Sequence, residues 1–136
     1  YCTACSGNGN TGNSDGQDIP KVDDSQLAYH NPVIRIAAPD PTAMRAKDGY
    51  FYLYATEDIR NLPIFRSRDM VKWEEIGTAF TDETRPDFLP DNKDVKERAH
   101  LWAPEIRYVK GKYVLFYSLA QWGNHWVSTV GYAVFL

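Results

Sequence analysis

The sequence predicts an all-β chain that forms about two blades of a β-propeller. Short runs rich in Val, Ile, Tyr and Phe follow one another, separated by breaks that contain Gly, Pro or Asp. No segment shows the apolar period of an amphipathic helix. The strand pattern also returns after 62 residues, and a repeat of this length made of short strands is typical of propeller blades.

Residues 1–27 differ in composition from the rest of the chain and predict a flexible tether. They are rich in Gly, Ser, Asn and Asp. Cys2 and Cys5 form a C-x-x-C pair, which is a zinc half-site or a redox motif in other settings, but no second pair follows. Thr3-Ala4-Cys5 instead resembles the end of a bacterial lipobox. We expect a lipid on Cys5 that tethers a secreted, periplasmic or outer-membrane protein; the alternative is a tail without function.

Residues 28–136 form the predicted propeller part, and its first blade has four predicted strands. β-branched and aromatic residues dominate them, and such residues fit a pleated, half-buried surface. Their close spacing predicts an antiparallel meander. The strand patterns are VIRIAA (33–38), GYFYLYAT (49–56), LPIFRSRD (62–69) and VKWEEIG (71–77).

A polar connection over residues 78–98 leads from this blade to a second one. The connection is long for a hairpin loop, and long loops often carry function. Three further strand patterns follow it, so the second blade is predicted to have about three strands. These patterns are HLWAPEIRYV (100–109), GKYVLFYSLA (111–120) and STVGYAVFL (128–136).

The repeat is clearest where DGYFYLYAT aligns with KGKYVLFYS. Gly49 then aligns with Gly111, and Thr56 with Ser118, at the same separation of 62 residues. A closed propeller needs about four to eight blades. We therefore expect residues 28–136 to be the front part of a longer protein. The alternative is a complete β-sandwich of about seven strands.

Composition narrows the class of partner. The chain has 136 residues, a formal net charge of −3 and no basic stripe, which argues against nucleic-acid binding. Aromatic residues reach 14%, which suits a β-rich core or a sugar-binding cleft. No apolar run is long enough to span a bilayer. His30, His100 and His125 lack the spacing of metal ligands, so we expect neither a metal nor an organic cofactor.

Seven motifs occur in order between Asn31 and Phe135: NPV, PDPTAMR, DGYFYLYAT, SRDMVKWEEIG, LWAPEI, GKYVLFYS and VGYAVF. Their order and spacing resemble the first two blades of glycoside hydrolase family 43, and the arabinanase and arabinofuranosidase members are most similar. The resemblance implies a five-bladed propeller in the parent protein. It also implies inverting hydrolysis of arabinose- and xylose-containing plant polysaccharides. Invertase-like relatives share a motif similar to SRDMVKW, but they carry Asn-Asp-Pro where this chain has Pro-Asp-Pro.

Asp40 stands between Pro39 and Pro41, and from the residues alone it is either a turn residue or a fixed functional carboxylate. The resemblance implies that Asp40 is the general base, on the innermost strand of the first blade. An inverting glycosidase uses one carboxylate to activate water and one carboxylic acid to protonate the leaving oxygen, roughly 6.5–9.5 Å apart. The resemblance places that acid and an orienting aspartate in later blades, and no segment of this chain matches either motif.

Several residues near the predicted inner strands are candidates for sugar binding. Trp102 precedes an Ala-Pro step and Trp122 follows YSLAQ, and flat aromatic rings suit stacking on a sugar. The resemblance favours Trp122 near the bound sugar and Glu105 in the pocket wall or in a structural role. Glu57 and Asp58 are expected at a loop rim. The alternative to a glycosidase is a non-catalytic carbohydrate-binding propeller, because the same groups serve binding alone.

Overall fold

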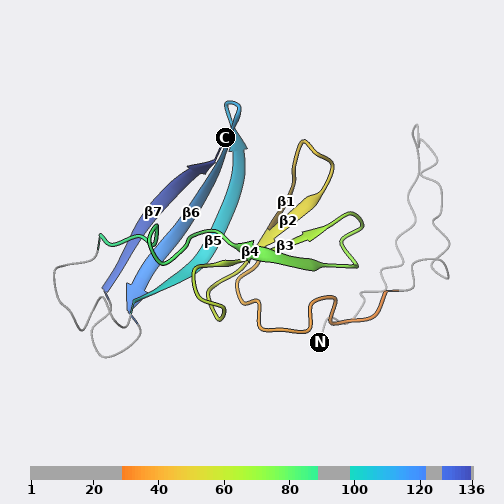
Figure 1. Ribbon diagram of the computed structural model, residues 1–136, viewed down its shortest axis with the longest axis horizontal. Coiled ribbons are helices and arrows are strands. Elements are labelled where there is room, and N and C mark those ends of the chain that lie inside the picture. Colours follow the sequence, from red (N-terminus) through yellow and green to blue (C-terminus); the bar gives the residue numbers. More distant parts are fainter. Residues whose placement is uncertain (1–28, 89–98, 122–126, 136) are drawn as a thin grey trace, which may run out of the picture.

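The computed structural model describes residues 29–88, 99–121 and 127–135, which form two antiparallel sheets (Figure 1). Strand order is β1-β2-β3-β4 in the first sheet and β5-β6-β7 in the second, so strands adjacent in sequence are adjacent in space. This arrangement confirms the predicted all-β class with two blade-like sheets. Among the described residues, no helix has the length and apolar character to cross a bilayer. The strands are β1 (Thr42–Arg45), β2 (Phe51–Tyr54), β3 (Pro63–Ser67), β4 (Glu74–Thr78), β5 (Ala99–Val109), β6 (Lys112–Gln121) and β7 (Val127–Phe135).

The innermost strand of the first sheet is not the one that the sequence predicts. Residues 33–38 form no strand, and the strand next to β2 is β1, within PDPTAMR. Val33 and Ile34 instead line a shared cavity with Leu53 of β2, so this β-branched run lies beside the sheet rather than in it. Tertiary packing here overrides β-propensity. As a consequence, Asp40 lies in the bend just before β1 and not on the strand.

Gly49 and Gly111 occupy the hairpin turns that join β1 to β2 and β5 to β6. Their φ angles are +84° and +88°, in the left-handed region where a Cβ atom costs energy. The two residues have equivalent places in the two sheets, as the repeat of 62 residues predicts.

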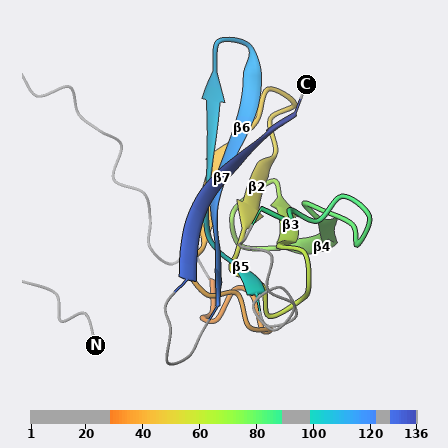
Figure 2. The ribbon, with the colours of Figure 1, turned by 90° about the vertical axis from the view of Figure 1, so that its left-hand side faces the viewer.

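The two sheets pack face to face through one apolar core, with β1 and β2 against β5. Figure 2 shows the sheet of β5, β6 and β7 in front of the first sheet. Met44 and Tyr54 pack against the core from the first sheet. Burial of a Leu or Ile side chain contributes about 1.5–3 kcal/mol, so this core is the main cohesion between the sheets. The core residues are Leu62, Phe80, Ala99, Leu101, Ile106, Leu115, Tyr117 and Leu119.

The other face of the second sheet is apolar and exposed. Phe116 is 43% exposed, Val130 is 74% exposed and Tyr132 is 67% exposed. The Phe116 and Tyr132 rings lie together with centroids 6.1 Å apart. Phe116 follows Tyr54 by 62 residues, and Tyr54 lies on the face of the first sheet that packs on the second. The exposed face is therefore the repeat equivalent of a packed face.

Candidate active-site face

Asp40 is held in a fixed conformation before β1. Its φ angle is +47°, and it lies between Pro39 and Pro41. Its carboxylate accepts a hydrogen bond of 2.7 Å from the Thr56 hydroxyl. The Thr56 backbone N–H also donates to the Pro39 carbonyl at 2.9 Å. Thr56 therefore fixes both the main chain and the side chain at this bend, while the Asp40 residue stays exposed to solvent.

A β-bulge in β5 brings the second sheet to the same hydroxyl. The register of β5 shifts between Trp102 and Glu105, and Ala103 within this bulge has a φ angle of +44°. The Ala103 N–H donates to the Thr56 hydroxyl oxygen at 2.7 Å. Because that oxygen accepts from Ala103, its own proton points to Asp40. Positive φ at a residue with a Cβ costs about 1–3 kcal/mol, and such strain concentrates at functional sites.

Glu57, directly after Thr56, is a buried anchor between the sheets. Its side chain is 3% exposed and forms a bidentate ion pair with Arg85 at 2.6 and 2.7 Å. The carboxylate also accepts from the Asn61 N–H at 2.9 Å. The Glu57 N–H donates to the Leu101 carbonyl of β5 at 3.0 Å. Glu57 is therefore not a rim residue, as the sequence predicts, but a paired group that fixes the chain beside Thr56.

The electrostatics at Glu57 favour the ionised carboxylate. Burial acts to raise the pKa of Glu57, but the hydrogen bonds from Arg85 and Asn61 and the charge of Arg85 outweigh it and hold the pKa below its ordinary value. His100 Nδ1 lies 3.2 Å from Glu57 Oε1, and the His100 side chain is 54% exposed. A carboxyl group that stays ionised in this way does not suit a general acid.

Glu105 and Trp102 lie in the same bulged part of β5. Glu105 accepts a hydrogen bond of 3.1 Å from the Thr42 hydroxyl of β1 and pairs with Arg107. Trp102 is partly exposed, opposite Ser118 of β6 and directly before Ala103. The structure thus brings Asp40, Glu105 and Trp102 to adjoining parts of β1 and β5. Trp122 and Cys5 lie outside the described residues.

Among the described residues, no group of three or more His, Cys, Asp or Glu side chains has the arrangement of a metal site. The exposed and rigid carboxylate of Asp40 is suited to accept a proton from water without a metal. Sequence analysis missed the roles of Thr56 and Arg85. The alignment of Thr56 with Ser118 marks a repeated hydroxyl position, but no local pattern pairs Arg85 with a glutamate 28 residues away.

Comparison with known proteins decides the family. Residues 29–134 match the model of glycosyl hydrolases family 43. The chain belongs to this family. Family 43 members of known structure share its fold: the chain superposes on a Cellvibrio cellulosa α-L-arabinanase with a TM-score of 0.60 and 31% identity, over 74% of this chain and 30% of the arabinanase. The two sheets are thus two blades of a five-bladed family 43 propeller.

Two curated family 43 relatives are similar in sequence. A non-reducing-end α-L-arabinofuranosidase of Bacteroides ovatus is 31% identical over 90 residues, which is 65% of this chain and 16% of that protein. An extracellular exo-α-(1→5)-L-arabinofuranosidase of Cellvibrio japonicus is 33% identical over 96 residues, which is 70% of this chain and 25% of that protein. This family 43 chain therefore spans a quarter or less of the length of these two relatives, the second of which is an extracellular bacterial enzyme.

Proposed function

We propose that the protein containing this chain is an inverting glycoside hydrolase that acts on arabinose- or xylose-containing polysaccharides, with Asp40 as general base. The observation that carries the proposal is the rigid, exposed Asp40 carboxylate in a family 43 chain. The similar proteins named as arabinanase and arabinofuranosidases favour an arabinan-type substrate.

In the proposed reaction, the Asp40 carboxylate takes a proton from a water molecule as its oxygen attacks the anomeric carbon. A carboxylic acid about 6.5–9.5 Å away protonates the leaving oxygen, and the configuration inverts in one displacement. We assign the acid and the aspartate that orients it to other parts of the whole protein. Trp102 and Trp122 would stack on sugar rings, and Glu105 would line the wall beside them.

The test of this function replaces Asp40 by Asn in the whole protein. Activation of the water is needed in the transition state, so kcat should fall by about 10²–10⁴-fold with a modest change in KM. The measurement is kcat per folded protein, with NMR detection of the first anomer released. A variant that keeps more than half the wild-type kcat but melts earlier would make Asp40 a turn residue. Binding of sugars without hydrolysis by the wild type would favour a non-catalytic module.

We further propose that residues 1–136 alone do not hydrolyse glycosides, because no segment of this chain matches the family acid or orienting aspartate. The test incubates the purified chain with aryl arabinofuranosides, aryl xylosides and arabinan. Turnover that disappears in Asp40→Asn would contradict this proposal.

For localisation, we propose that Cys5 is lipidated and that residues 1–27 tether the propeller, residues 28–136 being its front part. The small residues before Cys5 and the polar stretch after it support this. A fatty-acid probe fed to the native host should label the wild type and not Cys5→Ala. Equal labelling and equal fractionation of the two proteins would refute the tether.

A further inference from the structure

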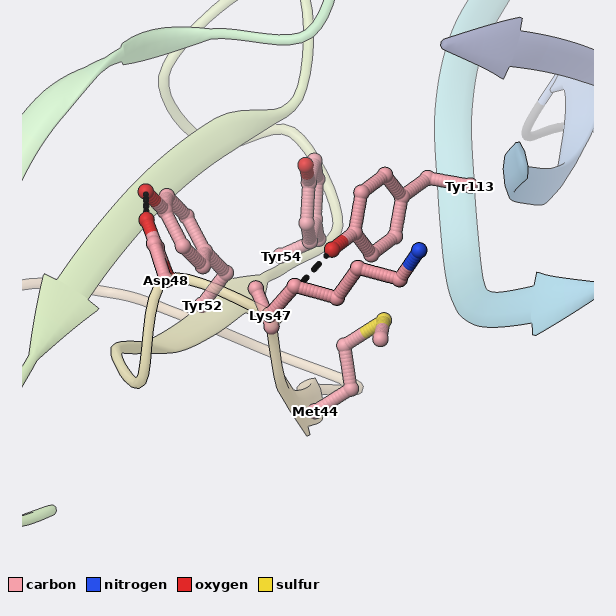
Figure 3. A pocket seen from close by; sticks show the side chains of 7 residues that line it. Met44, Lys47, Asp48, Tyr52, Tyr54 and Tyr113 are labelled. Carbon is pink, nitrogen blue, oxygen red and sulfur yellow. Dashed lines mark hydrogen bonds between the residues drawn. The ribbon is translucent and has the colours of Figure 1, made fainter. Parts of the chain in front are cut away.

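A cavity of about 410 Å³ opens between the two sheets, at the end of β1 away from Asp40 (Figure 3). Its walls come from β1, the turn after it, β2 and β6. The volume falls within the range of about 300–1,000 Å³ that is typical of small-molecule sites. The lining residues are Met44, Ala46, Lys47, Asp48, Tyr52, Tyr54 and Tyr113.

Internal hydrogen bonds hold the cavity walls in place. The Tyr52 hydroxyl donates to Asp48 at 2.8 Å, and the Lys47 backbone N–H donates to the Tyr113 hydroxyl at 3.1 Å (Figure 3). The Lys47 ammonium lies 4.6 Å from the centroid of the Tyr108 ring. These contacts join the first sheet to β6 across the cavity. The rings therefore keep their positions when no ligand is bound, which lowers the cost of ordering on binding.

Tyr54 differs from the other two tyrosines of the cavity. Its ring packs against the core, and burial raises the pKa of its hydroxyl. Among the described residues, the hydroxyl makes no hydrogen bond to the protein, whereas those of Tyr52 and Tyr113 do. A partly buried hydroxyl without a protein partner is available to a bound molecule.

We propose that this cavity binds a sugar unit of the polysaccharide, at a second site separate from Asp40. Tyrosine rings and Met44 offer apolar surface to the C–H face of a sugar, and the free Tyr54 hydroxyl offers one hydrogen bond to a sugar hydroxyl. Lys47 and Asp48 carry opposite charges at the rim, which fits a neutral ligand better than a charged one. The choice of an arabinose-type sugar rests on the proposed function. Such a site would hold the protein on the polymer while the catalytic face acts on another segment.

The two methionines of this chain give a direct readout. Met44 lines the cavity, and Met70 is 49% exposed in the turn between β3 and β4. The experiment labels the methionine methyl groups with ¹³C in the whole Asp40→Asn protein, assigns them with Met70→Leu, and titrates a linear α-1,5-arabino-oligosaccharide or a xylo-oligosaccharide. The Met44 resonance should shift in a saturable way, and that of Met70 should not.

Three variants connect the shift to the cavity. Tyr54→Phe removes only the free hydroxyl and should weaken binding by about two- to twelvefold without lowering the melting temperature. Ala46→Phe fills the cavity and should abolish the Met44 shift. Tyr132→Phe removes a hydroxyl from the exposed face of the second sheet and is the matched control, with unchanged affinity.

The outcomes separate this proposal from the proposed function. A Met44 resonance that does not move at millimolar sugar, or that moves equally in Ala46→Phe, overturns the second site even if the protein hydrolyses arabinan. A saturable Met44 shift that Ala46→Phe abolishes supports the second site even if no hydrolysis is found. Hydrolysis of a soluble aryl glycoside should be the same in Tyr54→Phe and wild type, while hydrolysis of insoluble arabinan should be slower in Tyr54→Phe.

Discussion

Thr56 connects two strained residues from different blades, Asp40 and Ala103. Its hydroxyl accepts from the Ala103 N–H and donates to the Asp40 carboxylate, both at 2.7 Å. The carboxylate is thereby oriented from the blade body rather than by its own loop. Because a shift of about 1 Å in a reacting group costs on the order of a hundredfold in rate, this orientation bears directly on the proposed chemistry.

We predict that Thr56→Val lowers kcat of the whole enzyme by about tenfold or more and leaves KM nearly unchanged, since the hydroxyl does not need to contact substrate. The unfolding free energy should fall by about 1 kcal/mol from the lost hydrogen bonds. Thr56→Ser keeps the hydroxyl and should restore most of kcat. Steady-state kinetics and urea unfolding of both variants test the prediction. Equal kcat values in the Val and Ser variants would show that Thr56 has no positioning role.

At the element scale, most strands could be predicted from the sequence and one could not. β2, β3, β5, β6 and β7 are long or aromatic enough to give clear patterns, and the turn glycines Gly49 and Gly111 support them. β1 has four residues, TAMR, with little β-propensity. It is a strand because it pairs with β2 and packs on β5. Residues 33–38 have the stronger local pattern and lie outside the sheet.

The candidate site follows the same division between local and distant information. Asp40 could be located because two prolines and a family motif flank it. The connection from β4 to β5 contributes Arg85, whose partner Glu57 lies between β2 and β3. Such a pairing depends on how the blades pack, and a single sequence contains no local pattern for it.

The pair of Glu57 and Arg85 should make stability depend on pH. The pKa of Glu57 is lower in the folded state than its ordinary value of 4.5, so its stabilisation is complete above that value. It is lost as pH falls through the lower, folded-state pKa. We therefore predict that wild type loses stability on acidification below about pH 4.3, and that a double variant, Glu57→Gln with Arg85→Met, lacks this component.

The single variant Glu57→Gln leaves the Arg85 side chain, which is 12% exposed, without a counter-charge. It should lose about 3–5 kcal/mol of unfolding free energy at neutral pH, and the double variant should recover part of that loss. Glu74→Gln is the matched control, because the pair of Arg66 and Glu74 is exposed and should cost less than about 1 kcal/mol. Urea unfolding across pH measures all four proteins. Parallel pH curves for wild type and the double variant would rule out this role.

At the scale of the whole molecule, the two sheets are not equivalent in what covers them. The face of the first sheet that carries Tyr54 is packed on the second sheet, whereas the equivalent face of the second sheet exposes Phe116, Val130 and Tyr132. Propeller blades repeat the same packing around a ring. We therefore expect another blade to cover this face in the whole protein, as the second sheet covers the first.

The exposed face leads to the prediction that residues 1–136, prepared alone, associate with a second copy through this face. Burial of Val or aromatic side chains is worth about 1.5–3 kcal/mol each, so apolar contact between two such faces is favourable. The double variant Val130→Lys with Tyr132→Lys places two charges on β7 and should shift the chain to monomer at the same concentration. Met70→Lys with Val71→Lys adds the same charge on exposed apolar residues in the turn between β3 and β4, so it controls for net charge and should still associate. Sedimentation velocity over a concentration series measures the three proteins. A wild-type chain that stays monomeric and unfolds cooperatively would show that the two blades are stable with this face in water.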